Sequence, residues 1–114
     1  MTTDSEFMTA ADAALAAIGR ALDAALADSD ADLDWTLHDG ILEIDCGGGG
    51  KLVVNRHLPN REIWVAARSG GFHFAARGGA WRDTRSGAEL GAALAALLRA
   101  QGRLEVALPP LPAP

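Results

Sequence analysis

The chain has 114 residues, a formal charge of −5, 49% hydrophobic residues and one cysteine, Cys46. This length suits one domain with a two-layer core, and a single cysteine excludes an intramolecular disulfide, as is typical of a reducing compartment. The charge is uneven: residues 1–45 hold eleven acids and one base (−10), and residues 46–114 hold four acids and nine bases (+5). The acidic half is excluded as a nucleic-acid surface, which needs clustered Lys and Arg, but it can attract cations or a basic protein.

The N-terminal stretch MTTDSEF lacks the basic and apolar regions of a signal peptide. No uncharged apolar stretch reaches the ~18 residues that a membrane span needs. We therefore expect a cytoplasmic protein that does not enter a membrane.

The first 27 residues have helical periodicity. Apolar side chains recur every three or four positions: Phe7, Ala11, Leu15, Ile18, Leu22 and Leu26. Thr3 and Glu6 have the spacing of a capping box at a helix start. The pattern predicts one helix that ends near Ala27.

Four aspartates occupy every second position of the next stretch: Asp28, Asp30, Asp32 and Asp34. An EF-hand begins in this way, but it needs Gly where Leu33 stands and Glu where Asp39 stands. In an extended chain the four carboxylates would share one side about 7 Å apart, and neighbours would repel by roughly 0.5 kcal/mol in water. Two interpretations stay open: a solvated loop that aids solubility, or a surface for a hard cation or an Arg-rich partner.

Six short segments with strand character follow, at residues 32–37, 41–46, 51–56, 61–67, 71–77 and 80–83. The links between them are short and rich in Gly, Asn and Pro, which favours an antiparallel meander. In the fourth segment, alternation puts Ile63 and Val65 on one face and Glu62 and Trp64 on the other. We expect Trp64 on the solvent face of the sheet.

A second capping box, Ser86 to Glu89, predicts the start of another helix, which Gly102 would end. Its apolar stripe consists of Leu90, Leu94, Leu97 and Leu98. Both helices must bury their stripes against the same sheet, so the fold class is α+β: a two-layer α/β sandwich of a helix, an antiparallel sheet of five or six strands, and a helix. Residues 1–114 then form a single domain, with 103–114 as an extended C-terminal tail in the groove between the helices.

No enzyme motif stands out. Gly47–Gly50 and Lys51 invite comparison with a phosphate-binding loop, but Leu52 occupies the position of the required Ser or Thr. The three histidines are predicted in a turn, a loop and a strand, and belong to no nucleophile motif: His38, His57 and His73. We expect neither catalytic activity nor an organic cofactor.

Several motifs follow one another over residues 4–102: DSEF, the acidic run, GILEI, KLVVNRHLPNREIWVAA, GGFHF, the Trp81 strand and RSG before the last helix. Their order resembles that of the bacterial frataxin (CyaY) family. The most specific element is Asn55-Arg56-x-x-Pro59 followed by Ile63-Trp64.

This resemblance implies a protein of iron–sulfur cluster assembly that binds iron (Fe²⁺ or Fe³⁺) weakly, without catalysis. The implied metal ligands form an acidic ridge: Asp23, Asp28, Asp30, Asp32 and Asp34. The implied partners are the cysteine desulfurase, which the protein would regulate, and the iron–sulfur scaffold protein, with Asn55 and Trp64 as the sheet contact. Nucleic acid and membrane are not expected partners, and we expect a monomer without iron. The alternative is an iron store or iron chaperone that oligomerises on iron loading.

Family members usually carry more acids on the last turns of the first helix than this chain, which has Gly19, Arg20 and Ala24 there. The resemblance therefore concentrates the ridge in the loop and the first strand.

Overall fold

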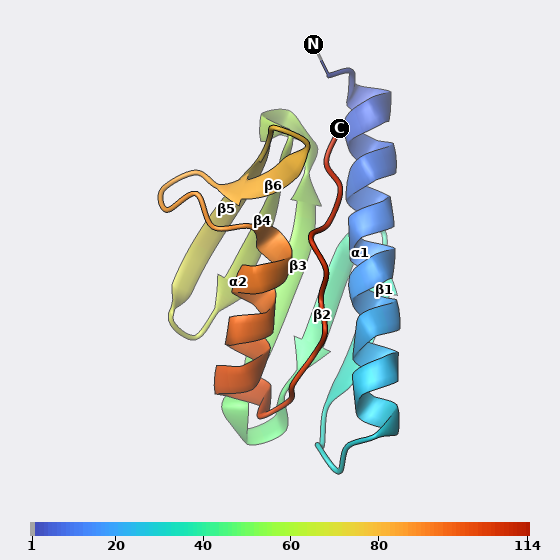
Figure 1. Cartoon of the computed structure of the whole chain (residues 1–114), viewed down its shortest axis with the longest axis vertical. Helices are drawn as coiled ribbons and strands as arrows, with labels where there is room; N and C mark the ends of the chain where they lie inside the picture. Colours follow the sequence, from blue (N-terminus) through green and yellow to red (C-terminus); the bar gives the residue numbers. More distant parts are fainter. Residues whose placement is uncertain (1) are drawn as a thin grey trace.

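The computed structural model describes residues 2–114, which form two layers (Figure 1). Helices α1 (Asp4–Ala27) and α2 (Leu90–Leu97) lie on one face of a six-stranded antiparallel sheet. Among residues 2–114, no helix covers the opposite face, which we call the open face. The predicted α+β sandwich is confirmed, with six strands. None of the helices in this part of the chain is long and apolar enough to cross a membrane.

The capping box predicted at the start of α1 is present. Thr3 Oγ1 accepts a 3.0 Å hydrogen bond from the Glu6 backbone, and Glu6 Oε1 accepts one of 3.1 Å from the Thr3 backbone. These bonds satisfy two N–H groups at the start of the helix, which lack intrahelical partners. The predicted stripe is the buried face of α1, except that Leu26 is only partly buried. The helix ends at Ala27, as the sequence predicts.

The strands follow one another in space in chain order, as a meander. They are β1 (Asp34–His38), β2 (Ile41–Asp45), β3 (Lys51–His57), β4 (Glu62–Ala67), β5 (Gly70–Arg77) and β6 (Ala80–Asp83). Short helical turns, η1 (Gly47–Gly49) and η2 (Leu58–Asn60), precede and follow β3. Several predicted boundaries were wrong by one or two residues. β1 begins at Asp34 and not at Asp32, and His38 and His57, which we expected in a turn and a loop, are the last residues of β1 and β3.

The turn between β1 and β2 depends on a glycine. Gly40 has a φ of 74°, and a Cβ at this position would lie 2.5 Å from the guanidinium carbon of Arg56. Only glycine therefore leaves room for Arg56 to cross the turn and to pair with Asp12 on α1. This contact ties the sheet to the helix layer.

The predicted cap of α2 was wrong. The helix begins at Leu90, and its N-cap is Glu89, whose carboxylate accepts hydrogen bonds from the Gly91 and Ala92 backbones at 2.8 and 3.0 Å. Ser86 caps only the preceding turn, since its hydroxyl accepts a hydrogen bond from the Ala88 backbone. A carboxylate at the cap accepts hydrogen bonds from the free N–H groups, and its negative charge interacts favourably with the positive end of the helix dipole. After α2, a π-helical turn, η3 (Leu98–Gly102), completes the helical segment.

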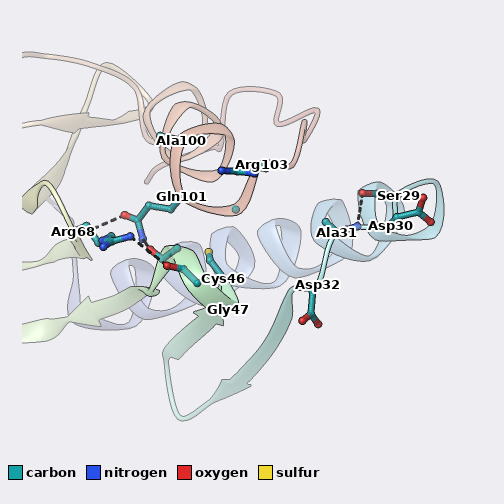
Figure 2. Close-up of a pocket in the computed structure, with 13 residues that line it drawn as sticks. Ser29, Asp30, Ala31, Asp32, Cys46, Gly47, Arg68, Ala100, Gln101 and Arg103 are labelled. Carbon is teal, nitrogen blue, oxygen red and sulfur yellow. Dashed lines mark hydrogen bonds between the residues drawn. The ribbon is translucent and has the colours of Figure 1, made fainter.

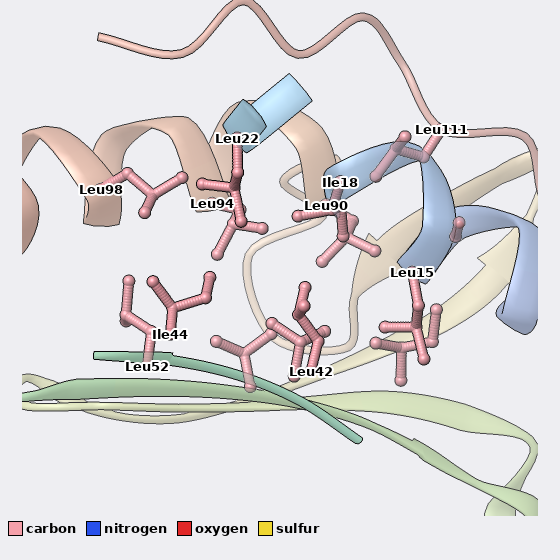
Figure 3. Packing of buried hydrophobic residues seen from close by; sticks show 14 of the residues in the cluster. Leu15, Ile18, Leu22, Leu42, Ile44, Leu52, Leu90, Leu94, Leu98 and Leu111 are labelled. Atoms are coloured by element: carbon pink, nitrogen blue, oxygen red, sulfur yellow. The ribbon is translucent and has the colours of Figure 1, made fainter. Parts of the chain in front are cut away.

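The core lies between the helices and the sheet (Figure 3). Apolar side chains of α1, α2, η3, β2 and β3 meet there: Leu15, Ile18, Leu22, Leu42, Ile44, Leu52, Leu90, Leu94 and Leu98. The tail that follows η3 runs between α1 and α2 and buries Leu104, Val106 and Leu111 (Figure 1). The Leu111 backbone donates a 3.0 Å hydrogen bond to Glu89, so the cap of α2 also holds the tail.

Candidate acidic surface and open sheet face

Residues 28–34, which we call the acidic segment, connect α1 to β1. Burial alternates along the segment: Ser29 and Ala31 are half-buried and Leu33 is buried, whereas the aspartates between them are exposed. Leu33 packs in the core and anchors the segment. The four aspartates therefore face solvent because the odd-numbered residues turn inward, although only Asp34 belongs to a strand.

Asp23 is the one predicted ligand on α1. It is exposed, and its Oδ1 accepts a 2.9 Å hydrogen bond from the indole Nε1 of Trp35 in β1. The Trp35 ring lies close to the helix because Gly19 has no side chain: a Cβ there would approach the ring to 2.7 Å. A glycine within α1 thus lets the first strand approach the helix beside Asp23.

Asp45 is an acidic residue of this surface that the sequence analysis missed. In the antiparallel pairing of β1 with β2, Asp45 lies directly opposite Asp34. Both are exposed, and directly opposed side chains place their Cβ atoms about 4.5–5.5 Å apart. Asp45 also accepts a 2.9 Å hydrogen bond from the Gly47 backbone. The short turn between β1 and β2 could have pointed to Asp45, because the loop length of a hairpin fixes which residues oppose each other. Like charges in such a pair are destabilising.

The carboxylates of this surface are dispersed. Within residues 2–114, no three His, Cys, Asp or Glu side chains are grouped closely enough to hold a metal ion. Figure 2 shows the side chains of Asp30 and Asp32 extending in different directions. Such a surface offers single oxygen ligands to a hard cation that keeps most of its water, and no enclosed metal site.

A cleft of about 680 Å³ lies between the acidic segment, η1 and the end of η3 (Figure 2). Gln101 ties its wall together: its Nε2 donates to the Gly49 carbonyl at 3.1 Å, and its Oε1 accepts from the Arg68 backbone at 3.0 Å. Cys46 also lines the cleft and is 7% exposed, and burial raises the pKa of its thiol. A raised pKa keeps the thiol protonated and weakly reactive near neutral pH.

The open face holds the predicted sheet contact. Asn55 in β3 lies directly opposite Trp64 in β4, so the two predicted residues are cross-strand neighbours. Trp64 is on the open face, as expected, but it is half-buried because two imidazoles stack on it. These belong to His57 and His73, which the sequence analysis assigned to no nucleophile motif.

The fold and these two surfaces define a class: a two-layer α+β sandwich whose candidate binding groups lie on the outside of the molecule. A family model described as the frataxin-like domain matches residues 1–103, and the chain belongs to this family.

Named relatives agree with this assignment. The chain is 43% identical over 105 residues to a protein of Burkholderia mallei named iron-sulfur cluster assembly protein CyaY. This match covers 92% of this chain and 96% of that protein. It is 48% identical over 92 residues to a protein of the same name from Paraburkholderia phymatum, over 81% of this chain and 84% of that one.

Solved structures show the same fold. A frataxin from Psychromonas ingrahamii has a TM-score of 0.74 and 29% identity, over 92% of this chain and 96% of that chain. A trimeric frataxin from Saccharomyces cerevisiae, complexed with ferrous iron, has a TM-score of 0.67 and 30% identity, over 75% and 78% of the two chains.

Proposed function

We propose that this protein acts in iron–sulfur cluster assembly, where it binds iron weakly and regulates the cysteine desulfurase. Its relatives from Burkholderia and Paraburkholderia carry the name of an iron–sulfur cluster assembly protein, and they match most of the chain. The observation that carries the proposal is the row of exposed carboxylates between α1 and β1, in a chain of this family.

Iron binds at the acidic surface, through Asp23, Asp28, Asp30, Asp32 and Asp34. Carboxylate oxygens are hard ligands, and dispersed ones hold a hydrated cation loosely. The yeast frataxin of similar fold was solved in complex with ferrous iron, which supports iron as the cation. Asp34 and Asp45 add local negative charge, since they oppose each other across two strands.

The same surface docks the desulfurase. Exposed carboxylates attract a basic protein surface over a distance of about one Debye length, ~8–10 Å at moderate salt. The open face, with Asn55 and Trp64, contacts the scaffold protein. The aspartates lie between α1 and β1 and at the β1 edge of the sheet, whereas Asn55 and Trp64 lie in β3 and β4, so one molecule can offer both contacts.

The protein itself performs no catalysis in this proposal and carries no organic cofactor. It works in the cytoplasm as a monomer when iron is absent. A second candidate function is iron storage or iron chaperoning by assembly into larger particles, which the trimeric yeast frataxin favours.

The test is a binding experiment between this protein and a purified bacterial cysteine desulfurase at two salt concentrations. We expect complex formation that weakens as salt rises, because the contact is electrostatic. Replacing the four aspartates of the acidic segment by Asn should abolish the complex. A single Asp39→Asn substitution is the control, since Asp39 is also exposed but lies in the turn between β1 and β2. Binding by the four-Asn variant as strong as that of the parent protein would refute the proposal.

Size-exclusion chromatography with and without Fe²⁺ under air separates the two functions. An adaptor of the desulfurase should stay monomeric at modest iron loading. Elution as large particles that retain iron would favour storage instead.

A further inference from the structure

Three rings form a stack on the open face. The His57 ring centroid lies 3.6 Å from that of Trp64, with an interplanar angle of 11°, and the His73 centroid lies 4.4 Å from it, at 7°. His57 belongs to β3 and His73 to β5, the strands on either side of Trp64 in β4. The indole is therefore held between two imidazoles and cannot lie flat on the sheet.

Glu62 fixes the edge of the same indole. Its Oε1 accepts a 2.8 Å hydrogen bond from Trp64 Nε1 and lies 3.6 Å from His73 Nδ1. The Glu62 side chain is only 15% exposed, so this bond is sheltered from water. Three neighbours thus hold one rotamer of Trp64 in the free protein, and a partner that binds it does not have to order this side chain.

The upright indole forms one wall of a hollow of about 190 Å³. The other walls come from Val53, Asn55, Ala66, Gly71 and His73. Gly71 lines the hollow without filling it. A Cβ at this position would project into free space, since its nearest neighbour would be the Val65 carbonyl oxygen at 4.0 Å. Within residues 2–114, Asn55 Oδ1 is buried and has no hydrogen-bond partner. Buried acceptors are normally paired, so this atom is suited to a donor from outside the chain.

We propose that His57, His73 and Glu62 are positioning residues, which hold Trp64 upright so that the hollow receives one apolar side chain of the scaffold protein. An N–H group beside that side chain donates to Asn55 Oδ1. This inference rests on the proposed scaffold contact through the open face. It adds the residues that prepare the contact and the kind of group that enters it.

The first test uses the free protein. Ring protons that lie over an indole shift upfield in NMR spectra, so the His57 and His73 ring protons should be shifted in the parent and return to ordinary positions in Trp64→Leu. His38 is the internal control, since its side chain is 89% exposed at the end of β1. Unshifted His57 and His73 protons in the parent would overturn the stack, whatever the partner does.

The second test measures the affinity for a purified bacterial iron–sulfur scaffold protein by calorimetry. The double variant His57→Ala, His73→Ala should bind about tenfold more weakly, because Trp64 is then mobile in the free protein and must be ordered on binding. The variant His57→Phe, His73→Phe should recover the affinity, because flat rings restore the stack without nitrogen atoms. Gly71→Val, which fills the hollow, should weaken binding without lowering thermal stability, and His38→Ala should change nothing.

The outcomes separate the two proposals. If Trp64→Ala binds the scaffold as the parent does, the scaffold contact itself is wrong. If Trp64→Ala loses binding while the double alanine variant keeps it, only the positioning role is wrong. If the double phenylalanine variant fails to recover affinity, the imidazoles contact the partner directly, which also overturns the positioning role.

Discussion

The indole Nε1 of Trp35 donates a 2.9 Å hydrogen bond to Oδ1 of Asp23, which links the first strand to the helix that precedes the acidic segment. A tryptophan thus reports on one of the proposed metal ligands. A cation that binds Asp23 competes with the indole for the same carboxylate.

Titration with Fe²⁺, and with diamagnetic Ca²⁺ as a control for paramagnetic broadening, should perturb the NMR amide signals of residues 23 and 28–34. The Trp35 indole N–H signal should move with them, because its acceptor is engaged by the metal. The ring signals of His57 and His73 should stay unchanged, since carboxylates supply the ligands. Shifts centred on the histidines would contradict this assignment.

Removing the negative charge at Asp34 should stabilise the fold. Asp34 opposes Asp45 across β1 and β2, and opposed like charges cost about 0.2–1 kcal/mol. Asp34→Asn should therefore raise the free energy of unfolding, measured with urea, by an amount in that range. Asp30→Asn, in the irregular part of the acidic segment, is the matched control and should have a smaller effect. A loss of stability in Asp34→Asn would show that its carboxylate is structural.

Asp83 should make stability depend on acid pH. The Arg85 backbone N–H, which donates to Asp83 Oδ1 at 2.8 Å, lowers the pKa of this carboxyl, and hydrogen bonds from Ser86 lower it further. A lowered pKa gives stability that is present above the pKa of the unfolded chain, near 4, and is lost as pH falls through the folded value. Asp83→Asn should lose about 1–2 kcal/mol at pH 7, and the difference from the parent should shrink as pH falls from 4 to 2. A difference that stays constant over this range would contradict the linkage.

Two tryptophans should differ in their structural importance. Trp81 is fully buried, meets Phe7 edge to face at 5.8 Å and donates a 3.0 Å hydrogen bond to the Pro112 carbonyl in the tail. Trp81→Ala should cost about 3–5 kcal/mol, as for other large core side chains. Trp64→Ala, which loses two ring stacks on a half-buried side chain, should cost about 1–2 kcal/mol. Urea denaturation of both variants measures the contrast, and equal losses would show that Trp64 is also a core residue.

The sequence alone determined the local elements of this protein. The stripe of α1, its capping box and its end near Ala27 follow from contacts between residues three or four positions apart. Five or six strands in meander order follow from alternation and short turns, and the structure has six. The side of the sheet that Trp64 occupies follows from its alternation with the buried Ile63. The motifs that surround Asn55 and Trp64 were also sufficient to indicate the family.

The tertiary structure decided the contacts between distant residues. The start of α2 was mispredicted: Glu89 itself caps the helix through the Gly91 and Ala92 backbones, and its carboxylate also binds the Leu111 backbone in the tail, a contact that no local rule contains. The pairing of Asp34 with Asp45 depends on strand register, and the stack on Trp64 depends on the packing of three strands. A one-residue change of register would move each of these side chains to the other face of the sheet. Local patterns therefore specify which elements form, and only the register and packing of those elements specify which side chains meet.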